Sequence, residues 1–424
     1  MTLRSNLQWQ FLGTGLSKAF IFLFYILLPL SIGVEEYGKF SFALATSFII
    51  VQPILEMGLD IVIAKWVTRG RHGVLKQALT LRIMAVSLAA PLALAASFIL
   101  PLDRTVLFLL LPYFVVSALQ NLLFAFFRGI EDMRREALIL PLEKCAALIL
   151  LPLLSLLGIT HASLGATALL CSVLIGASVL LATSTPNLQR AFVKGAATGT
   201  LPYRDLLKEG VALGAVTFLW LIYFRIDSVM LGVMRGDVEV GIYNVAYKIL
   251  EGLLFVPATI MIVSFPTLAK RERFAEAFAT LLFLLGALGL AASAAIYFVA
   301  PSLIRIVFGA AFSPSAAVLQ TLSLALPPLF IGHLTTQSLV ALDLNKRYLL
   351  VASLGAFLNV LLNSVLIPWL GAVGAAWATV ATEVCVTLLC AYFLWKARPD
   401  VLSISAQIAA FQDTFSLLAR KINL

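Results

Sequence analysis

Four charged residues stand inside two apolar runs of the chain, and their types and spacing make them the first candidates for chemistry. Arg225, Asp227, Lys248 and Glu251 all lie within residues 224–270, where a short polar turn separates the two runs. A charge at the centre of a membrane-spanning helix costs at least about 2.5 to 3.5 kcal/mol on insertion scales, so such a residue normally faces a partner or a watery cavity. We therefore expect these side chains to serve a charged ligand or a coupling ion.

The composition indicates that these runs cross a membrane. Hydrophobic residues make up 61% and charged residues 12% of the 424 residues, whereas soluble domains carry about 25% charged residues. The mean hydropathy is +1.02, and no part of the chain is left for a soluble, enzyme-sized domain. The net charge of +9 is explained by loops that face anionic lipid headgroups. Membrane lipids are therefore the expected partners of this charge, and a nucleic acid is not.

The cysteines and histidines do not suggest a metal site. The cysteines lie in apolar runs without a CxxC pair, which is typical of buried packing residues, and the histidines are scattered singly. These residues are Cys145, Cys171, Cys385, Cys390, His72, His161 and His333. The sequence also lacks the glycine-lysine motif of a phosphate-binding loop. We expect neither a metal nor a cofactor.

Twelve stretches are long and apolar enough to cross a membrane, which takes about 20 residues at a rise of about 1.5 Å each. Their approximate limits are 9–32, 38–63, 78–101, 105–127, 137–158, 161–182, 209–234, 238–266, 277–307, 314–342, 347–369 and 372–395. The chain is therefore predicted to be an all-α polytopic membrane protein.

The distribution of basic residues predicts the orientation of these spans. If the first span enters from the cytoplasm, 21 of the 30 basic residues fall in cytoplasmic segments, and only Lys39, Arg104 and Arg235 fall outside. Positive residues are enriched in cytoplasmic loops. We therefore expect both termini in the cytoplasm and the protein in the cytoplasmic (inner) membrane.

The two halves of the chain repeat each other. Residues 164–168, LGATA, correspond to residues 373–377, VGAAW, and the segment 34–40, which precedes the second span, corresponds to 238–243, which begins the eighth. Six spans per half is an even number, so the halves have the same orientation and form parallel repeats. The predicted divisions are a first lobe at 1–182, a cytoplasmic linker at 183–208, a second lobe at 209–398 and a cytoplasmic tail at 399–424.

The tail is predicted to form an amphipathic helix. Its apolar residues alternate steps of four and three, at Ile404, Ile408, Phe411, Phe415, Leu418 and Ile422, which is one stripe of a helix. The other face is too polar to cross a membrane, so the helix is expected to lie on the inner membrane surface. A partner-binding helix, for example for glycan-assembly proteins, is the alternative.

Six basic and six acidic residues lie inside the predicted spans. Arg82, Arg305 and Asp60 are near span ends, where long side chains can reach the interface, so we discount them as functional residues. Adjacent helical residues point about 100° apart, and Glu143 and Lys144 are therefore not expected to neutralise each other along one face.

The spacing of the charged residues within residues 224–270 decides which of them can pair on one helix. Lys248 and Glu251 are three residues apart on one helix and can form an ion pair, whereas Arg225 and Asp227 are two apart and cannot face each other. Lys18 lies about 14 Å into the first span, near the membrane midplane. Because the first and seventh spans are equivalent in the repeat, we expect Lys18 and Arg225 to face each other across the cleft between lobes. Such a cationic pair would attract an anionic headgroup.

Three stretches of the second half carry a further signal, namely RIDSVMLGVMRGDVEVGIYNVAYKILEGLLFVPATIMIVSFPTLAK, AAVLQTLSLALPPLF and LNVLLNSVLIPWLGAVGAAWATVATE. Together with GVEEYGKFSFALATSFIIVQPILEMGLDIVIAK in the first half, they resemble the polysaccharide-unit flippases of bacteria and archaea. These form the Wzx-type branch of the multidrug/oligosaccharidyl-lipid/polysaccharide exporter superfamily. The resemblance implies a V-shaped, two-lobed transporter that moves a polyprenyl-diphosphate-linked oligosaccharide to the outer leaflet by alternating access. The resemblance further implies that basic residues lining the central cavity bind the diphosphate or acidic sugars, and Lys18, Arg225 and Lys248 match them.

Coupling to H⁺ or Na⁺ would need a carboxylate, and Asp227, Glu251, Glu383 and Glu56 are the candidates. Two other functions stay open. A cation-coupled multidrug antiporter of the same superfamily would use these acids as its main site, and a membrane glycan polymerase would need a large outer loop with acid/base groups. The outer connections are short, so we expect a secondary-type transporter and not an enzyme.

Overall fold

The computed structural model describes residues 3–195, 199–270 and 274–402, and this part of the chain contains helices and no strand. In lipid, every backbone polar group must be satisfied within the protein, which a helix achieves locally. The elements are α1 (Leu3–Ile32), α2 (Val34–Glu56), α3 (Leu59–Thr68), α4 (Val74–Ile99), α5 (Arg104–Gly129), α6 (Arg134–Leu156), α7 (Ser163–Gly195), α8 (Tyr203–Arg235), α9 (Asp237–Leu253), α10 (Phe255–Leu268), α11 (Phe274–Phe308), η2 (Ala310–Phe312), α12 (Ser315–Ser323), α13 (Leu326–Ala341), α14 (Asn345–Ala397) and η3 (Pro399–Leu402).

The described helices account for the predicted spans. Ten candidate spans are long and apolar enough to cross a membrane, and the bent pair of α12 and α13, at 45°, makes an eleventh. The 53-residue α14 contains one non-helical residue, Gly371 at φ 58° and ψ −134°. A straight helix of that length would be about 80 Å long against a hydrocarbon core of about 30 Å. Counted as two spans divided at Gly371, α14 brings the total to the predicted twelve.

The first hairpin of each half has the same turn. Gly33 alone joins α1 to α2 with φ 83° and ψ 176°, and Gly236 alone joins α8 to α9 with φ 89° and ψ 180°. This region of backbone space is open almost only to glycine. The matching turns agree with the repeat that the sequence predicts.

The second span of each half is also broken in both halves. In the first, α2 ends at Glu56, and Met57 (φ 44°) and Gly58 (φ 63°) are left-handed before α3 begins. In the second, α9 and α10 meet at Leu254, which keeps helical angles of φ −66° and ψ −10°, so this interruption is weaker. Each break lies close to a proline, Pro53 and Pro257, whose missing N–H removes one helical hydrogen bond.

The chain divides into two compact units, Met1–Gly241 and Ile242–Leu424. In the first unit α2 packs on α4, α5 and α8, while α6 packs on α1 and α7. In the second unit α13 packs on α10, α11 and α14. By its contacts α8 belongs to the first unit, although the repeat assigns it to the second lobe. The boundaries of the lobes stay a prediction.

The core of the first unit lies between α3, α4 and α5, where Val62, Ile63, Leu122 and Phe127 are completely buried. In the second unit Phe274, Leu326 and Leu334 are completely buried. Large apolar side chains are also widely exposed, for example Trp369 at 83% and Ile306 at 82%. A surface of this kind is expected where the solvent is lipid.

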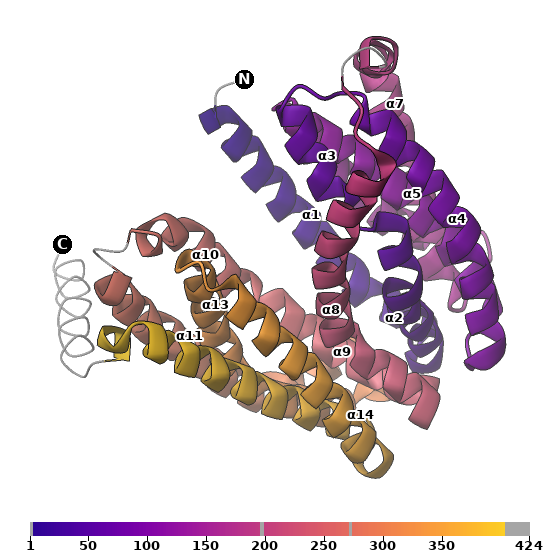
Figure 1. The fold of residues 1–424 in the computed structure, drawn as a ribbon. Coiled ribbons are helices and arrows are strands. Elements are labelled where there is room, and N and C mark those ends of the chain that lie inside the picture. The colour runs from indigo at the N-terminus through magenta and orange to yellow at the C-terminus, as the bar shows by residue number, and fades with distance from the viewer. Residues whose placement is uncertain (1–2, 196–198, 271–273, 403–424) are drawn as a thin grey trace, which may run out of the picture. The chain divides into compact units, whose positions relative to one another are not determined.

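Helix α8 packs against both α2 and α3 (Figure 1). Near one end, a Cβ placed on Gly232 would lie 2.6 Å from the Phe42 ring. At the break between α2 and α3, a Cβ placed on Gly58 would lie 2.4 Å from the carbonyl oxygen of Gly210 and 2.5 Å from the nitrogen of Gly214. Glycine is therefore required for the two backbones to approach this closely.

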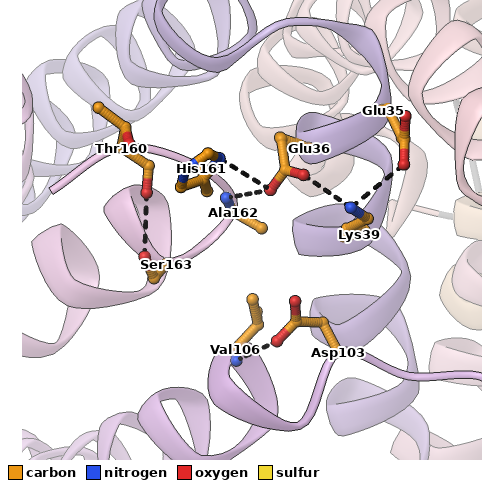
Figure 2. A network of polar contacts seen from close by, with 9 residues as sticks. All are labelled: Glu35, Glu36, Lys39, Asp103, Val106, Thr160, His161, Ala162 and Ser163. Atoms are coloured by element: carbon orange, nitrogen blue, oxygen red, sulfur yellow. Dashed lines mark hydrogen bonds and ion pairs between the residues drawn. The ribbon is translucent and has the colours of Figure 1, made fainter.

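Polar side chains fix the beginnings of several helices of the first unit (Figure 2). The Glu36 carboxylate on α2 accepts a hydrogen bond of 2.8 Å from the backbone N–H of Ala162, just before α7. Lys39 Nζ lies 2.7 Å from the Glu36 carboxylate and 3.2 Å from that of Glu35. Asp103 caps α5 by accepting from the N–H of Val106 at 3.0 Å. Of these contacts, the one between Glu36 and Ala162 ties the start of α2 to the start of α7.

The structure describes most of the predicted linker but only the first residues of the predicted tail. Within 183–208, α7 continues to Gly195 and α8 begins at Tyr203, so most of this segment is helical among the residues that are described. The tail begins with η3 at Pro399–Leu402. Its predicted amphipathic helix, from residue 403 onward, lies outside the described residues.

Candidate functional site

Lys18 lies on an exposed face of α1. The adjacent face of that helix is buried against α6, because a Cβ placed on Gly13 would lie 2.4 Å from the carbonyl oxygen of Ala137. Ser17 is on this buried face and donates to the carbonyl oxygen of Gly13 at 2.8 Å. Neighbouring helical residues point about 100° apart, so Lys18 projects away from the α1–α6 contact.

Arg225 lies on the side of α8 that faces α2. Its guanidinium carbon is 5.1 Å from the centre of the Phe48 ring on α2, and Phe48 packs edge-to-face on Phe114 of α5 at 5.1 Å. A guanidinium at this distance over an aromatic face is attracted by the ring quadrupole. The side chain is half-buried, so the ring positions a cation that is still partly accessible.

Helices α1 and α8, which carry Lys18 and Arg225, both contact α2 in the first unit. That these two side chains face each other across a cleft stays a prediction.

Lys248 and Glu251 form the ion pair that their spacing predicts. Lys248 Nζ lies 2.6 Å from Glu251 Oε2 on α9, with the lysine side chain 12% exposed and the glutamate 37% exposed. The pairing is confirmed. Each of the two charges is therefore largely neutralised within one helix.

The remaining carboxylates predicted as coupling candidates differ in burial. Asp227 on α8 is 3% exposed and Glu383 on α14 is 7% exposed, whereas Glu56 at the end of α2 is half-buried. Neither deeply buried carboxylate is in free contact with solvent, so each depends on polar groups of the protein around it.

Glu56 is held by two amide side chains that the sequence analysis did not single out. Its Oε1 accepts hydrogen bonds from Gln52 Nε2 at 3.0 Å and from Asn121 Nδ2 on α5 at 3.2 Å. Gln52 and Glu56 are four residues apart in an apolar helix, and this polar spacing is the signal that could have identified Gln52. No local pattern points to Asn121, because it comes from another helix.

The prediction that Arg82 reaches the membrane interface is wrong. Arg82 is 0% exposed, and its Nη2 donates to Asp60 Oδ1 at 3.0 Å and to the backbone oxygen of Glu56 at 3.2 Å. Its Nη1 donates to the backbone oxygen of Ala118. A guanidinium has five N–H donors, and here it satisfies the carbonyl left without a helical partner where α2 ends. Asp60 and Arg82 therefore hold the break between α2 and α3.

The expectation that Glu143 and Lys144 do not neutralise each other is also wrong. Lys144 Nζ lies 2.5 Å from Glu143 Oε1, and Gln120 Nε2 on α5 donates to Glu143 Oε2 at 3.1 Å. The Cβ atoms of adjacent residues diverge, but the long lysine stem curves back to the carboxylate. This pair is balanced and ties α6 to α5.

The arrangement can bind ions without covalent chemistry. Among the described residues, no group of three or more His, Cys, Asp or Glu side chains is placed to hold a metal ion. The basic side chains Lys18 and Arg225 can bind anions, and Glu56 with its two amides offers oxygen atoms to a cation.

Comparison with known sequences relates the chain to polysaccharide biosynthesis. A family model described as "Polysaccharide biosynthesis protein" matches residues 3–272. The chain is 28% identical over 199 residues to a protein of Haloferax volcanii named "Probable flippase AglR". That alignment covers 44% of this chain and 42% of the relative, so the chain matches less than half the length of that curated protein.

Solved structures share the fold over nearly the whole chain. The lipid II flippase MurJ in an inward closed conformation matches with a TM-score of 0.68 at 14% identity, over 96% of this chain and 92% of that one. An inward-facing multidrug resistance transporter of the MATE family and MOP superfamily matches with a TM-score of 0.67 at 16% identity, over 91% and 94% of the two chains. A MOP superfamily transporter from Pyrococcus furiosus matches with a TM-score of 0.60 at 16% identity, over 92% and 94%. At these identities the likeness concerns the fold.

Proposed function

Because this chain belongs to the family of polysaccharide biosynthesis proteins, we propose that it is a flippase for a polyprenyl-diphosphate-linked oligosaccharide. It carries this lipid from the inner to the outer leaflet of the cytoplasmic membrane, where the glycan enters surface polysaccharide. The family match over residues 3–272 is the observation that carries the proposal. The resemblance to a probable flippase and the transporter fold support it.

The substrate headgroup is held by electrostatic attraction. Lys18, Arg225 and Lys248 bind the diphosphate, Arg225 by two parallel N–H bonds and the lysines as point charges. Arg225 is the strongest of the three candidates, because the Phe48 ring orients it while Lys248 is paired to Glu251. The lipid tail stays in the bilayer during transfer, and rocking of the lobes at 1–182 and 209–398 changes the side to which the headgroup is accessible.

Transport is coupled to H⁺ or Na⁺ through a carboxylate that changes its charge state or its ligand. Asp227, Glu251, Glu383 and Glu56 are the candidates. Both termini lie in the cytoplasm, as the basic loops favour, and the tail at 399–424 lies on the membrane surface or contacts glycan-assembly proteins.

The test is the profile of lipid-linked sugars in cells that lack the protein. The proposal expects one diphosphate-linked oligosaccharide to accumulate on the cytoplasmic side and the corresponding surface glycan to disappear, with both effects reversed by the intact gene. Unchanged lipid-linked sugars together with increased drug sensitivity would contradict the proposal and favour a multidrug antiporter. Accumulation of single, unpolymerised units in the outer leaflet would instead favour a glycan polymerase.

A further inference from the structure

The Glu56 carboxylate is bound by neutral groups only. Within the described part of the chain its hydrogen-bond donors are the amides of Gln52 at 3.0 Å and Asn121 at 3.2 Å, and no basic side chain forms an ion pair with it. An amide stabilises a carboxylate but leaves its charge in place. A negative charge in this setting depends on a positive charge nearby.

The nearest cation does not provide that charge. Arg82 directs Nη2 to the side chain of Asp60 at 3.0 Å and to the backbone oxygen of Glu56 at 3.2 Å, and Nη1 goes to the backbone oxygen of Ala118. The guanidinium thus neutralises Asp60 and contacts only the main chain of Glu56. Two carboxylates and one guanidinium leave one negative charge without compensation at the break between α2 and α3.

The elements packed against α2 also leave this charge in place. Among the described side chains, the titratable groups on these elements that are buried or half-buried are Tyr25 on α1, Asp60 on α3, Arg82 on α4, Tyr113 on α5, Cys171 on α7 and Glu209, Tyr223, Arg225 and Asp227 on α8, with Glu143 and Lys144 on α6, which contacts α5. Lys18 on α1 and Arg128 on α5 are exposed. Arg128 pairs with Glu136 at 3.4 Å, and Glu143 pairs with Lys144. Arg225 lies over Phe48, eight residues and about 12 Å before Glu56 along α2.

The oxygen atoms around Glu56 are suited to a small cation. Gln52 Oε1 is buried and has no hydrogen-bond partner. Pro53 lacks an N–H, so the carbonyl of Ile49 one turn earlier loses its helical donor. The carbonyl end of a helix carries about half a negative charge, and α2 ends at Glu56, whose own backbone oxygen is already bound by Arg82. Carbonyl ends of broken membrane helices coordinate Na⁺ or H⁺ in transporters.

We propose that Glu56, Gln52 and Asn121 form a site for one positive charge, taken as a proton or as one monovalent metal ion. The ligand neutralises the charge left over by Asp60 and Arg82. Its role as the coupling ion rests on the proposed flippase function, but its binding does not. Among the four candidate carboxylates, this assigns the coupling role to Glu56.

The site is tested with purified full-length protein in lipid nanodiscs without any glycan. The midpoint temperature of thermal unfolding is measured at pH 8.5 in choline chloride, NaCl, LiCl or KCl, and also in choline chloride at pH 5.5. A metal-ion site raises the wild-type midpoint by about 4 °C or more in one of the metal salts at saturating concentration. A proton site raises the midpoint at pH 5.5, and the metal salts at pH 8.5 leave it unchanged. In Glu56→Gln the corresponding rise is lost, because the amide mimics the neutralised carboxylate.

Three further variants test the charge balance and the ligands of the site. Asp60→Asn frees Arg82 to compensate Glu56, so the ion-dependent rise shrinks. Glu143→Gln removes a buried carboxylate of a different, already balanced pair, and the rise stays as in wild type. Asn121→Ala keeps the charge but removes one ligand, so that half-saturation needs about tenfold more ion. This last variant preserves the test if Glu56→Gln does not fold.

The proposal is overturned if Glu56→Gln keeps the full wild-type rise, or if the wild type responds neither to metal ions nor to acid. The two proposals fail separately. A Glu56-dependent rise without any accumulated lipid-linked sugar in deletion cells would leave the ion site standing and remove the flippase function. Accumulated lipid-linked sugar without a Glu56-dependent rise would do the reverse.

Discussion

Arg82 Nη2 and Asp60 Oδ1 lie 3.0 Å apart and join α4 to α3 inside the first unit. Both residues belong to hydrophobic spans, and the arginine is fully buried. The guanidinium also binds backbone oxygens of α2 and α5, so one side chain links four helices at the point where α2 is broken. The contacts of Arg82 thus stabilise the break between α2 and α3.

We predict that Arg82→Gln destabilises the protein by about 3 to 5 kcal/mol, because it leaves the half-buried Asp60 without this partner. The matched control is Arg305→Gln, which changes an exposed arginine of α11 and should alter the free energy of unfolding by no more than about 0.5 kcal/mol. Thermal unfolding in detergent compares the two. Equal midpoints for both variants would contradict the structural role of Arg82.

Arg225→Ala is expected to lower glycan export at least about tenfold at equal protein level, which corresponds to about 1.4 kcal/mol of lost headgroup attraction. Lys18→Ala should have an effect of the same direction. Export is measured as surface glycan in deletion cells that express each variant. Arg235→Ala, at the exposed end of the same helix, should leave export unchanged. Normal export by both Arg225→Ala and Lys18→Ala would remove these residues from the site.

Lys248→Ala should lower export less than Arg225→Ala does, by about threefold or less. The reason is the ion pair of 2.6 Å with Glu251, which already cancels much of the lysine charge. Releasing the lysine should have the opposite effect, so Glu251→Gln is expected to keep or increase the affinity for the anionic headgroup. The same export assay checks both variants, and a larger loss in Lys248→Ala than in Arg225→Ala would reverse their proposed ranking.

Gly58→Ala should destabilise the contact between α8 and the break of α2 and α3. A left-handed conformation costs a residue with a Cβ about 1 to 2 kcal/mol, and here the Cβ would also lie 2.4 Å from the carbonyl oxygen of Gly210. Gly15→Ala is the control, because nothing lies within 4 Å of a Cβ at that position of α1. It should stabilise the helix by about 0.5 to 1 kcal/mol. The prediction would be contradicted if the midpoint temperatures of thermal unfolding of Gly58→Ala and Gly15→Ala shifted in the same direction from that of the wild type.

The amino-acid sequence by itself determined the membrane-spanning, all-helical character of the protein and the approximate position of its spans. Helices in lipid depend on local apolar runs, because each backbone hydrogen bond closes within the same segment. The repeat was also readable, because residues 34–40 and 164–168 correspond to residues 238–243 and 373–377. The pairing of Lys248 with Glu251 followed from a spacing of three residues on one helix.

Only the tertiary structure decided how the other charges are paired. Asp60 meets Arg82 and Glu56 meets Asn121 across different helices, and such contacts depend on the rotation and register of helices that no local pattern encodes. The pair of Glu143 with Lys144 depends on how a flexible side chain bends, which Cβ directions do not reveal. The balance of charge around Glu56 therefore depends on how α2, α3, α4 and α5 pack together. Apolar patterning places each helix in the membrane, but the partners of its buried charges are set by its neighbours.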